Sequence, residues 1–253
     1  MWYYINSFEF ANVNLLADSK DNKEWEELDL KGKKYNPPNG NKRDNGYKLI
    51  QSLKQNPEKF CFIEQLFEEY DHYGLDLSSL AELLQDKNDR IRWIAVYICH
   101  DLGSAAWDEL SDYIIPLLND KDIRIVKYAL KMSAYYPYRQ NCLIAFNYLN
   151  HSEQVIRLMA MEILASYRTF TLKYMLEYFS DKVETIYQEY VSILLSADKM
   201  SEDEINNLIN CDNQIKQKLA IIIACKYPEK FAQIIQQDFK DDDINQYILN
   251  KMK

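Results

Sequence analysis

The side chains that could carry out acid–base or metal chemistry are sparse in this sequence and widely spaced. His72, His100 and His151 have no second histidine three to five residues away, whereas a zinc site needs three or four converging ligands. The closest grouping is Cys99, His100 and Asp101, and consecutive helical residues point in different directions. No Gly-rich phosphate loop, G-x-S-x-G or H-E-x-x-H motif occurs. The sequence therefore predicts neither a catalytic centre nor a metal or cofactor site.

The composition indicates a soluble protein with one continuous core. Of the 253 residues, 47% are hydrophobic, and only five glycines and six prolines occur, which is few for a loop-rich fold. The N-terminus lacks a basic region followed by a hydrophobic core, and no run of 18 apolar residues occurs. We therefore expect neither an export signal nor a membrane span. The five cysteines form no C-x-x-C pair, which favours a reducing, cytoplasmic location.

A short pattern recurs along the chain and determines the expected architecture. Leu84 and Ala95 lie 11 residues apart, in a stretch where two leucines precede a polar turn and an apolar helix follows. The same spacing returns in four later copies: Leu118 to Ala129, Leu149 to Ala160, Phe179 to Tyr190 and Ile209 to Ala220. The steps between the closing residues are 34, 31, 30 and 30. A recurrence of this length is typical of stacked helical repeats.

Each copy is predicted to be two helices joined by a tight polar turn. The residues after the turn follow the i, i+3, i+4, i+7 order of one apolar helical face. These residues are Ile91, Ile94, Ala95 and Ile98, then Ile125, Tyr128, Ala129 and Met132, then Ile156, Met159, Ala160 and Ile163. Side chains suited to cap a helix occur at Asn88 or Asp89, Asp122 and Ser152, and capping-box spacing occurs at Ser79 with Glu82 and Ser201 with Glu204.

This pattern resembles a HEAT-type α-solenoid. The first copy carries the family's features best, because Ile91 and Arg92 open its second helix and the small Ala95 follows. Pro116 falls inside a first helix, where family members often carry a kinking proline. The resemblance covers roughly residues 75 to 225. It implies an all-α fold, a right-handed α-solenoid of about five to six helix pairs with an irregular N-terminal cap, and it names no activity.

Two regions are expected along the chain. Residues 1–48 form an extended or loop-like N-terminal cap, because residues 17–48 combine three glycines, a Pro-Pro pair and interspersed charges. The aromatic-rich residues 1–16 are expected to pack on the first repeat. Residues 49–253 form the HEAT-like helical repeat domain.

The charge is distributed unevenly between these regions. Of 39 acidic and 30 basic residues, residues 1–48 hold eight of each, so the whole net charge of −9 falls on residues 49–253. Such acidity repels nucleic-acid phosphates at long range and attracts basic partners. Many soluble proteins are acidic for solubility alone, so the charge leaves both interpretations open.

Basic residues recur near the start of the predicted second helices, at Arg90, Arg92, Arg124, Lys127 and Arg157. A basic stripe could follow a nucleic-acid backbone, and the alkylpurine DNA glycosylases, which resemble this chain in repeat architecture, bind DNA in a concave groove. The basic residues are interleaved with Asp86, Asp89, Asp120 and Asp122. This arrangement favours a ladder of contacts between the turns of successive repeats.

Aromatic side chains that lie off the apolar stripes give the predicted binding site. Its residues are Trp93, Tyr97, His100, Glu162, Glu184, Tyr187, Gln188 and Glu189, all on the side of the second helices that would line the concave surface. Exposed aromatic side chains among acidic ones suit the recognition of a basic protein. The alternative is that the N-terminal segment packs over Trp93.

The sequence therefore predicts a non-enzymatic protein-binding module whose acidic, aromatic concave face binds and neutralises a basic protein. The most concrete version is an immunity protein that inhibits a nuclease toxin. One alternative is a HEAT-like nucleic-acid enzyme of the alkylpurine DNA glycosylase type, in which Trp93 stacks on a base; another is a general scaffold or adaptor. Nucleic acid is the less favoured partner, and no cofactor is expected.

Overall fold

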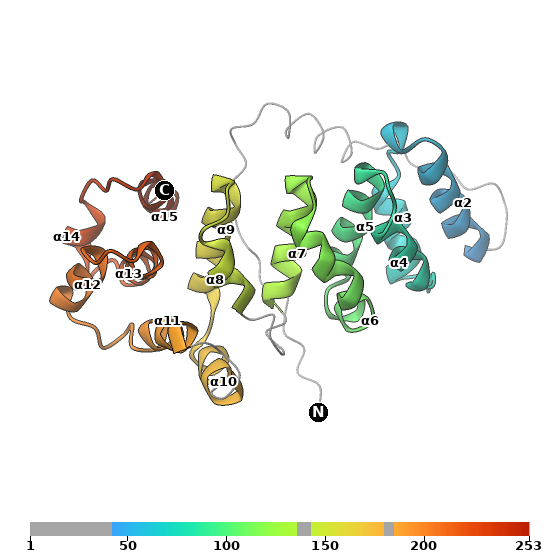
Figure 1. Cartoon of the computed structure of the whole chain (residues 1–253). Coiled ribbons are helices and arrows are strands. Elements are labelled where there is room, and N and C mark those ends of the chain that lie inside the picture. The colour runs from blue at the N-terminus through green and yellow to red at the C-terminus, as the bar shows by residue number, and fades with distance from the viewer. Residues whose placement is uncertain (1–41, 136–142, 180–184, 253) are drawn as a thin grey trace.

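The computed structural model describes residues 42–135, 143–179 and 185–252, and every regular element in these ranges is helical. The elements are α2 (Lys42–Gln55), η1 (Pro57–Lys59), α3 (Ile63–Asp71), α4 (Ser78–Leu84), α5 (Asp89–Leu102), α6 (Ser104–Ile114), η2 (Ile115–Asn119), α7 (Ile123–Tyr135), α8 (Ile144–Tyr148), α9 (Gln154–Ser166), α10 (Thr169–Phe179), α11 (Thr185–Leu195), α12 (Glu202–Ile209), α13 (Gln214–Lys226), α14 (Ala232–Ile235) and α15 (Asp242–Lys251). The helices stack along one long axis, from α2 to α12 and α14 (Figure 1), which confirms the predicted all-α solenoid.

The second helices form where the apolar stripes predict them. On α5, the stripe residues Ile91, Ile94, Ala95 and Ile98 are at most 3% exposed. Their burial follows from the position of α5, which packs against α4 on one side and α7 on the other. Asn88 caps this helix, since its side-chain oxygen accepts hydrogen bonds from the amides of Arg90 and Ile91.

Two further predicted caps are confirmed. At the start of α12, Ser201 and Glu204 form a complete capping box. At the start of α7, Asp122 Oδ1 accepts a hydrogen bond from the Arg124 amide at 2.9 Å. Both caps satisfy amides that have no partner inside the helix.

Two other predicted caps are wrong. Glu153, not Ser152, precedes α9, and the Glu153 amide donates to His151 Nδ1 at 3.1 Å. Ser79 and Glu82 form no capping box, because α4 begins at Ser78, two residues earlier than that spacing requires. Asp76 takes the role instead, accepting the first helical amide, that of Ser78, at 2.9 Å.

The first described helix, α2, begins at Lys42, inside the segment predicted to be a loop. The glycine at position 46 explains the difference. A Cβ at Gly46 would lie 2.7 Å from a methyl carbon of Leu75, so this glycine permits close helix packing rather than a turn. The rest of the predicted cap, residues 1–41, lies outside the described residues, and the division at residue 48 stays a prediction.

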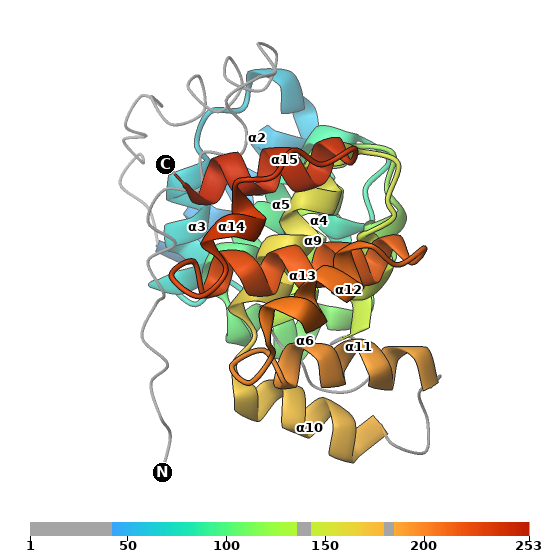
Figure 2. The same cartoon turned by 90° about the vertical axis from the view of Figure 1, so that its left-hand side faces the viewer.

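The stacking order changes after α9. Up to that point each second helix packs on the next, α5 on α7 and α7 on α9. The next helix with extensive packing against α9 is α13, whereas α11 lies beside α10, below the other helices (Figure 1 and Figure 2). The C-terminal α15 then packs against both α9 and α13. The last helices therefore close the end of the stack.

Candidate partner-binding site

Three of the predicted binding residues come together on α5 and meet a tyrosine of α7. The ring centroids of Trp93 and Tyr97 are 6.1 Å apart, those of Tyr97 and Tyr128 are 5.4 Å apart, and those of His100 and Tyr128 are 5.3 Å apart. The last two pairs are edge-to-face, an arrangement that stabilises aromatic packing. We call Trp93, Tyr97, His100 and Tyr128 the aromatic cluster. The cluster joins α5 to α7. The sequence predicts Tyr128 in the apolar stripe of the second helix, but in the structure Tyr128 belongs to this cluster and is only half-buried.

The sequence predicts that Trp93 lines an open acidic face, but in the structure it does not. Its side chain is buried, with 5% exposure. The guanidinium carbons of Arg90 and Arg124 lie 5.7 and 5.3 Å from the centroid of the indole ring, within the range of cation–π contacts. The prediction missed this burial because Arg124 belongs to the next repeat, so its proximity to Trp93 depends on the stacking of α7 against α5.

Tyr128 also has basic neighbours. The Nζ atoms of Lys127 and Lys131 lie 5.8 and 5.5 Å from the centroid of its ring. The charged groups in these contacts with Trp93 and Tyr128 are therefore positive. A basic partner would not be attracted to this part of the predicted site.

The grouping of Cys99, His100 and Asp101 is not a catalytic arrangement. His100 Nδ1 lies 2.9 Å from Asp101 Oδ1, while the Cys99 side chain is completely buried. Burial raises the pKa of the Cys99 thiol, which keeps the thiol protonated at neutral pH. A buried, protonated thiol is a poor nucleophile.

Lysine side chains neutralise two of the predicted acidic site residues. Glu162 is buried and pairs with Lys251, which belongs to the C-terminal α15. Glu189 pairs with Lys216 of α13 at 2.5 Å and stays partly exposed. Glu184 lies outside the described residues. A partner could reach Glu162 only if α15 moved. Because both described glutamates are paired with lysines, the described part of this face is less acidic than the sequence predicts.

Tyr187 and Gln188 lie on α11, apart from the aromatic cluster (Figure 1). The Tyr187 hydroxyl donates a hydrogen bond to Asn147 Oδ1, and its ring contacts Phe146 edge-to-face at 6.2 Å. Both Tyr187 and Gln188 are half-buried. The structure thus divides the described residues of the predicted site among α5, α9, which carries Glu162, and α11.

Arg92 forms the contact between turns that the interleaved charges predict. Its Nε and one terminal nitrogen donate to the carboxylate of Asp120, in the next turn, at 2.7 and 3.0 Å. The other terminal nitrogen donates to the carbonyls of Asp86 and Lys87 in its own turn. Burial raises the pKa of Asp120, but the hydrogen bonds and charge of Arg92, together with hydrogen bonds from the Asp122 and Lys121 amides, outweigh burial and lower this pKa. Arg92 therefore holds two successive turns together.

Arg157 occupies the same position in the third copy but reaches a different partner. It donates to both carboxylate oxygens of Asp243, on α15, at 2.6 and 2.9 Å. Lys218 of α13 donates to the same carboxylate at 2.7 Å and to the Leu149 carbonyl at 2.9 Å. Burial opposes ionisation of Asp243, yet the hydrogen bonds from Arg157 and Lys218 lower its pKa. One carboxylate thus joins α9, α13 and α15.

An acidic surface lies on α6, which is the first helix of its repeat and was not part of the predicted site. Asp108, Glu109 and Asp112 are exposed there, and Tyr113 beside them is 38% exposed. Within the described part of the chain, none of the three carboxylates takes part in an ion pair. We call these three residues the acidic face of α6. The signal in the sequence was three acidic residues within five positions in the middle of an amphipathic helix.

In the ranges that the structure describes, no three His, Cys, Asp or Glu side chains come together as metal ligands would. Among the described helices, none combines the length and the apolar composition that crossing a bilayer requires.

Comparisons with known proteins find structural likenesses at low sequence identity. No protein-family model and no curated protein sequence matches the chain. A designed armadillo repeat protein in complex with the peptide (KR)4 is similar over 84% of this chain and 98% of its own, at 11% identity and a TM-score of 0.45. An engineered protein is similar over 92% of this chain and 98% of its own (14% identity, TM-score 0.38). A second designed armadillo repeat protein is similar over 83% and 91% (14%, 0.34).

Proposed function

We propose that this chain is a non-enzymatic binding module that recognises a basic protein through the acidic face of α6. The observation that carries the proposal is that Asp108, Glu109 and Asp112 are exposed and have no ion-pair partner among the described residues. Exposed carboxylates beside an exposed tyrosine give a basic partner both charge complementarity and an aromatic contact.

The three carboxylates contribute little to the stability of α6. They lie beyond the first turn of the helix. The helix dipole would favour a negative charge only within that first turn. Asp108 and Asp112 are spaced i, i+4, and like charges at this spacing destabilise a helix by about 0.2–0.5 kcal/mol. A role in binding would account for acidic residues that local structure does not favour.

Several basic side chains, unlike the carboxylates of α6, make contacts within the fold. Several of them are directed inward: Arg90 donates to the carbonyls of Pro57 and Phe60, and Arg157 and Lys218 share a single carboxylate, that of Asp243. These basic side chains are therefore engaged within the fold, while the carboxylates of α6 are exposed on a chain with a net charge of −9. Such a surface attracts a basic protein at long range.

The most specific form of the proposal is an immunity protein that neutralises a cationic nuclease toxin. It is supported by the acidic surface and by a size that suits a one-to-one inhibitor. A scaffold or adaptor for another basic protein would use the same surface. The two are distinguished by asking whether the bound partner is a nuclease, and whether adding this chain inhibits it.

The residues predicted from the sequence contribute to the proposal unequally. Tyr97, His100, Tyr187 and Gln188 are half-buried, and we retain them as proposed contacts for apolar or polar parts of a partner. Trp93 and Glu162 are buried, so we assign them to packing.

Affinity capture from a lysate of the source cells, followed by mass spectrometry, tests the proposal. The baits are the wild-type chain, a variant with Asp108, Glu109 and Asp112 changed to lysine, and a control with Asp198, Glu229 and Asp238 changed to lysine. These last three are also exposed, so both variants have the same net charge. One stoichiometric basic protein should bind the wild type and the control, and be lost with the α6 variant and at high salt. Equal retention by all three baits would contradict the proposal.

The nucleic-acid enzyme is the second candidate, and one observation bears on it directly. In that alternative Trp93 stacks on a base, but the Trp93 side chain is buried, with Arg90 and Arg124 close to its indole ring. Arg92 and Arg157 are likewise engaged with carboxylates. The positive groups beside the aromatic cluster are what still favours this alternative. Salt-dependent binding of DNA at low ionic strength would support it.

A further inference from the structure

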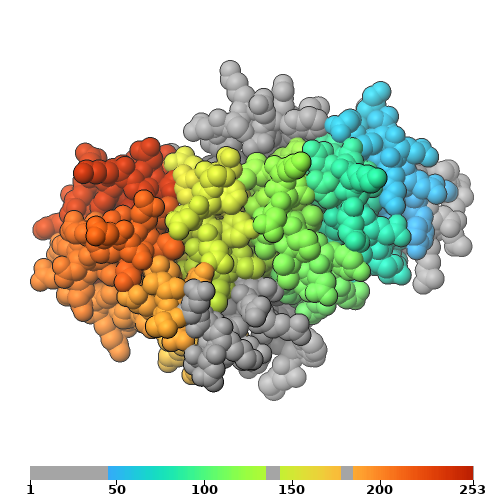
Figure 3. Space-filling model, in the orientation of Figure 1, coloured from blue at the N-terminus to red at the C-terminus, as the bar shows by residue number. Residues whose placement is uncertain are grey.

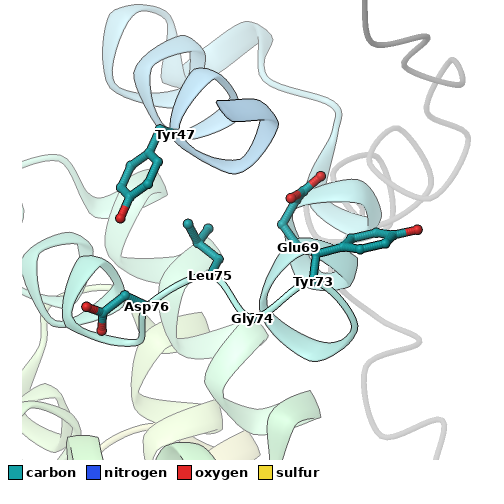
Figure 4. A pocket seen from close by; sticks show the side chains of 6 residues that line it. All are labelled: Tyr47, Glu69, Tyr73, Gly74, Leu75 and Asp76. Carbon is teal, nitrogen blue, oxygen red and sulfur yellow. The ribbon is translucent and has the colours of Figure 1, made fainter. Parts of the chain in front are cut away.

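A cavity of about 420 Å³ opens near the N-terminal end of the described stack, between α2 and the loop that joins α3 to α4. Its lining residues are Tyr47, Glu69, Tyr73, Gly74, Leu75 and Asp76. Tyr47 and Asp76 lie on one side of Leu75, and Glu69 and Tyr73 lie on the other (Figure 4). This volume is within the range of small-ligand sites.

The chemistry of the lining selects for a positive charge. Two of the six residues carry carboxylates, two carry phenol rings, and none is basic. Tyr47 is 52% exposed and lies on the same side of Leu75 as Asp76 (Figure 4), so its ring is accessible to a cation that Asp76 attracts. A hydrogen bond from the Ser78 amide lowers the pKa of Asp76. Its carboxylate is therefore ionised at neutral pH.

Several contacts fix the loop that forms the cavity. Gly74 has a φ of +68°, a conformation that other residues rarely adopt. The Leu75 amide donates to the Glu69 carbonyl at 2.9 Å, and the buried Leu75 side chain packs against Gly46. The Ser79 hydroxyl donates to the Asp76 carbonyl at 2.7 Å. A loop held in this way presents its acidic and aromatic groups in a preformed arrangement, which reduces the entropy lost on binding.

We infer that this cavity receives a lysine or arginine side chain of the basic partner on the side of Leu75 where Tyr47 and Asp76 lie (Figure 4), with Tyr47 contacting the cation and its alkyl chain and Asp76 supplying the negative charge. The inference rests on the proposed function, because it assigns a specific subsite to the recognition of a basic protein. It adds a second contact region, formed by α2, α3 and the following loop, to the acidic face of α6.

The five glycines of the chain provide a site-specific test. The full chain, labelled with ¹⁵N only at glycine, is titrated with a hexa-arginine peptide, with hexa-lysine and hexa-glutamate as further probes. Gly74 lines the cavity and Gly46 contacts Leu75, whereas Gly103 lies at the junction of α5 and α6. The amide signals of Gly74 and Gly46 should shift saturably with the basic peptides and not with hexa-glutamate, while that of Gly103 reports separately on peptide bound at the acidic face of α6.

Matched variants then test the side chains. Tyr47→Ala with Asp76→Asn removes one ring and one charge, and asparagine retains the oxygen that accepts the Ser78 amide. This variant should need about five- to tenfold more peptide for the same shifts, as expected for losing one cation–π contact and one exposed ion pair. Phe170→Ala with Asp198→Asn changes an exposed aromatic and an exposed acid elsewhere, and should behave as the wild type.

The outcomes separate this inference from the proposed function. Unshifted Gly74 and Gly46 signals, or equal titration of the wild type and the Tyr47/Asp76 variant, would overturn the cavity as a subsite. If the triple lysine variant of α6 still weakened partner capture in that case, the proposed function would stand. If neither the cavity variant nor the α6 variant changed binding, both would be wrong.

Discussion

Charged side chains have different roles in the turns between repeats and on the acidic face of α6. In the turns, Arg92 and Arg157 each donate to a carboxylate that is at most 6% exposed, so these charges position helices. On α6, Asp108, Glu109 and Asp112 are exposed and in no described ion pair. The difference indicates that a change in the turns should affect folding, while a change on α6 should affect binding alone.

The largest effect is expected from Asp243→Ala. Removing this carboxylate leaves Arg157 and Lys218 without their shared partner at the junction of α9, α13 and α15. Breaking a buried ion pair from one side typically lowers the free energy of unfolding by about 3–5 kcal/mol. Chemical denaturation measures the change. The neighbouring Asp242→Ala is the control, and it should lose at most about 1 kcal/mol through the helix dipole; equal losses in the two variants would contradict the assigned role of Asp243.

A smaller loss is expected from Arg92→Ala, which removes the contact between the first and second turns. The variant loses two hydrogen bonds to Asp120 and two to carbonyls of its own turn, some of which water can replace because Arg92 is half-buried. We expect a loss of about 1–3 kcal/mol in the free energy of unfolding. Lys87→Ala, an exposed change in the same turn, should stay within about 0.5 kcal/mol. A loss no larger than this control would show that the ladder contact does not stabilise the fold.

The turn contacts also predict a dependence on pH. The pKa values of Asp120 and Asp243 are lower in the folded chain than in free aspartate, so both contribute stability when the pH is above the unfolded value of about 3.9. This contribution falls as the pH drops below that value and is lost once the lowered pKa values are passed. Urea denaturation between pH 7 and pH 3 should show the decline, with a shallower dependence for Asp243→Asn than for the wild type. Identical dependences would contradict the role of the ionised Asp243.

The smallest effect on stability is expected from the α6 variant with three lysines. Its side chains are exposed and form no described ion pair, so the free energy of unfolding should stay within about 0.5 kcal/mol of the wild type. Thermal or urea denaturation checks this. A loss of more than about 1.5 kcal/mol would mean that the acidic face contributes to folding, and that a binding defect in this variant could not be attributed to the surface alone.

The parts of the fold that depend on local pattern could be predicted from the sequence. The apolar stripe of α5 and the caps at Asn88, Asp122 and Ser201 each involve residues within about one or two turns of one another. Caps were mispredicted where a closer competitor was available, as when Asp76 accepts the Ser78 amide in place of the expected box at Ser79. The sequence alone predicts a loop at Gly46, because Leu75, the residue against which it packs, is distant in the sequence.

The candidate site was harder to predict because its environment comes from distant segments. Glu162 pairs with Lys251, 89 residues further along the chain, and Arg157 meets Asp243 after 86 residues. The repeat register places these residues on a helix face but does not show which later helix covers that face. The change in stacking order after α9 has the same origin, since the fourth copy has the repeat spacing although α13, not α11, packs extensively on α9.

Carboxylate footprinting of the complex with its captured partner tests the central claim most directly. A carbodiimide and an amine label exposed carboxyl groups, and mass spectrometry compares labelling of each residue in the free and bound chain. The labelling of Asp108, Glu109 and Asp112 should fall on binding, while that of Asp198, Glu229 and Asp238 should not change. Unchanged labelling on α6 with a saturating partner would contradict the claim that this chain binds a basic protein through the acidic face of α6.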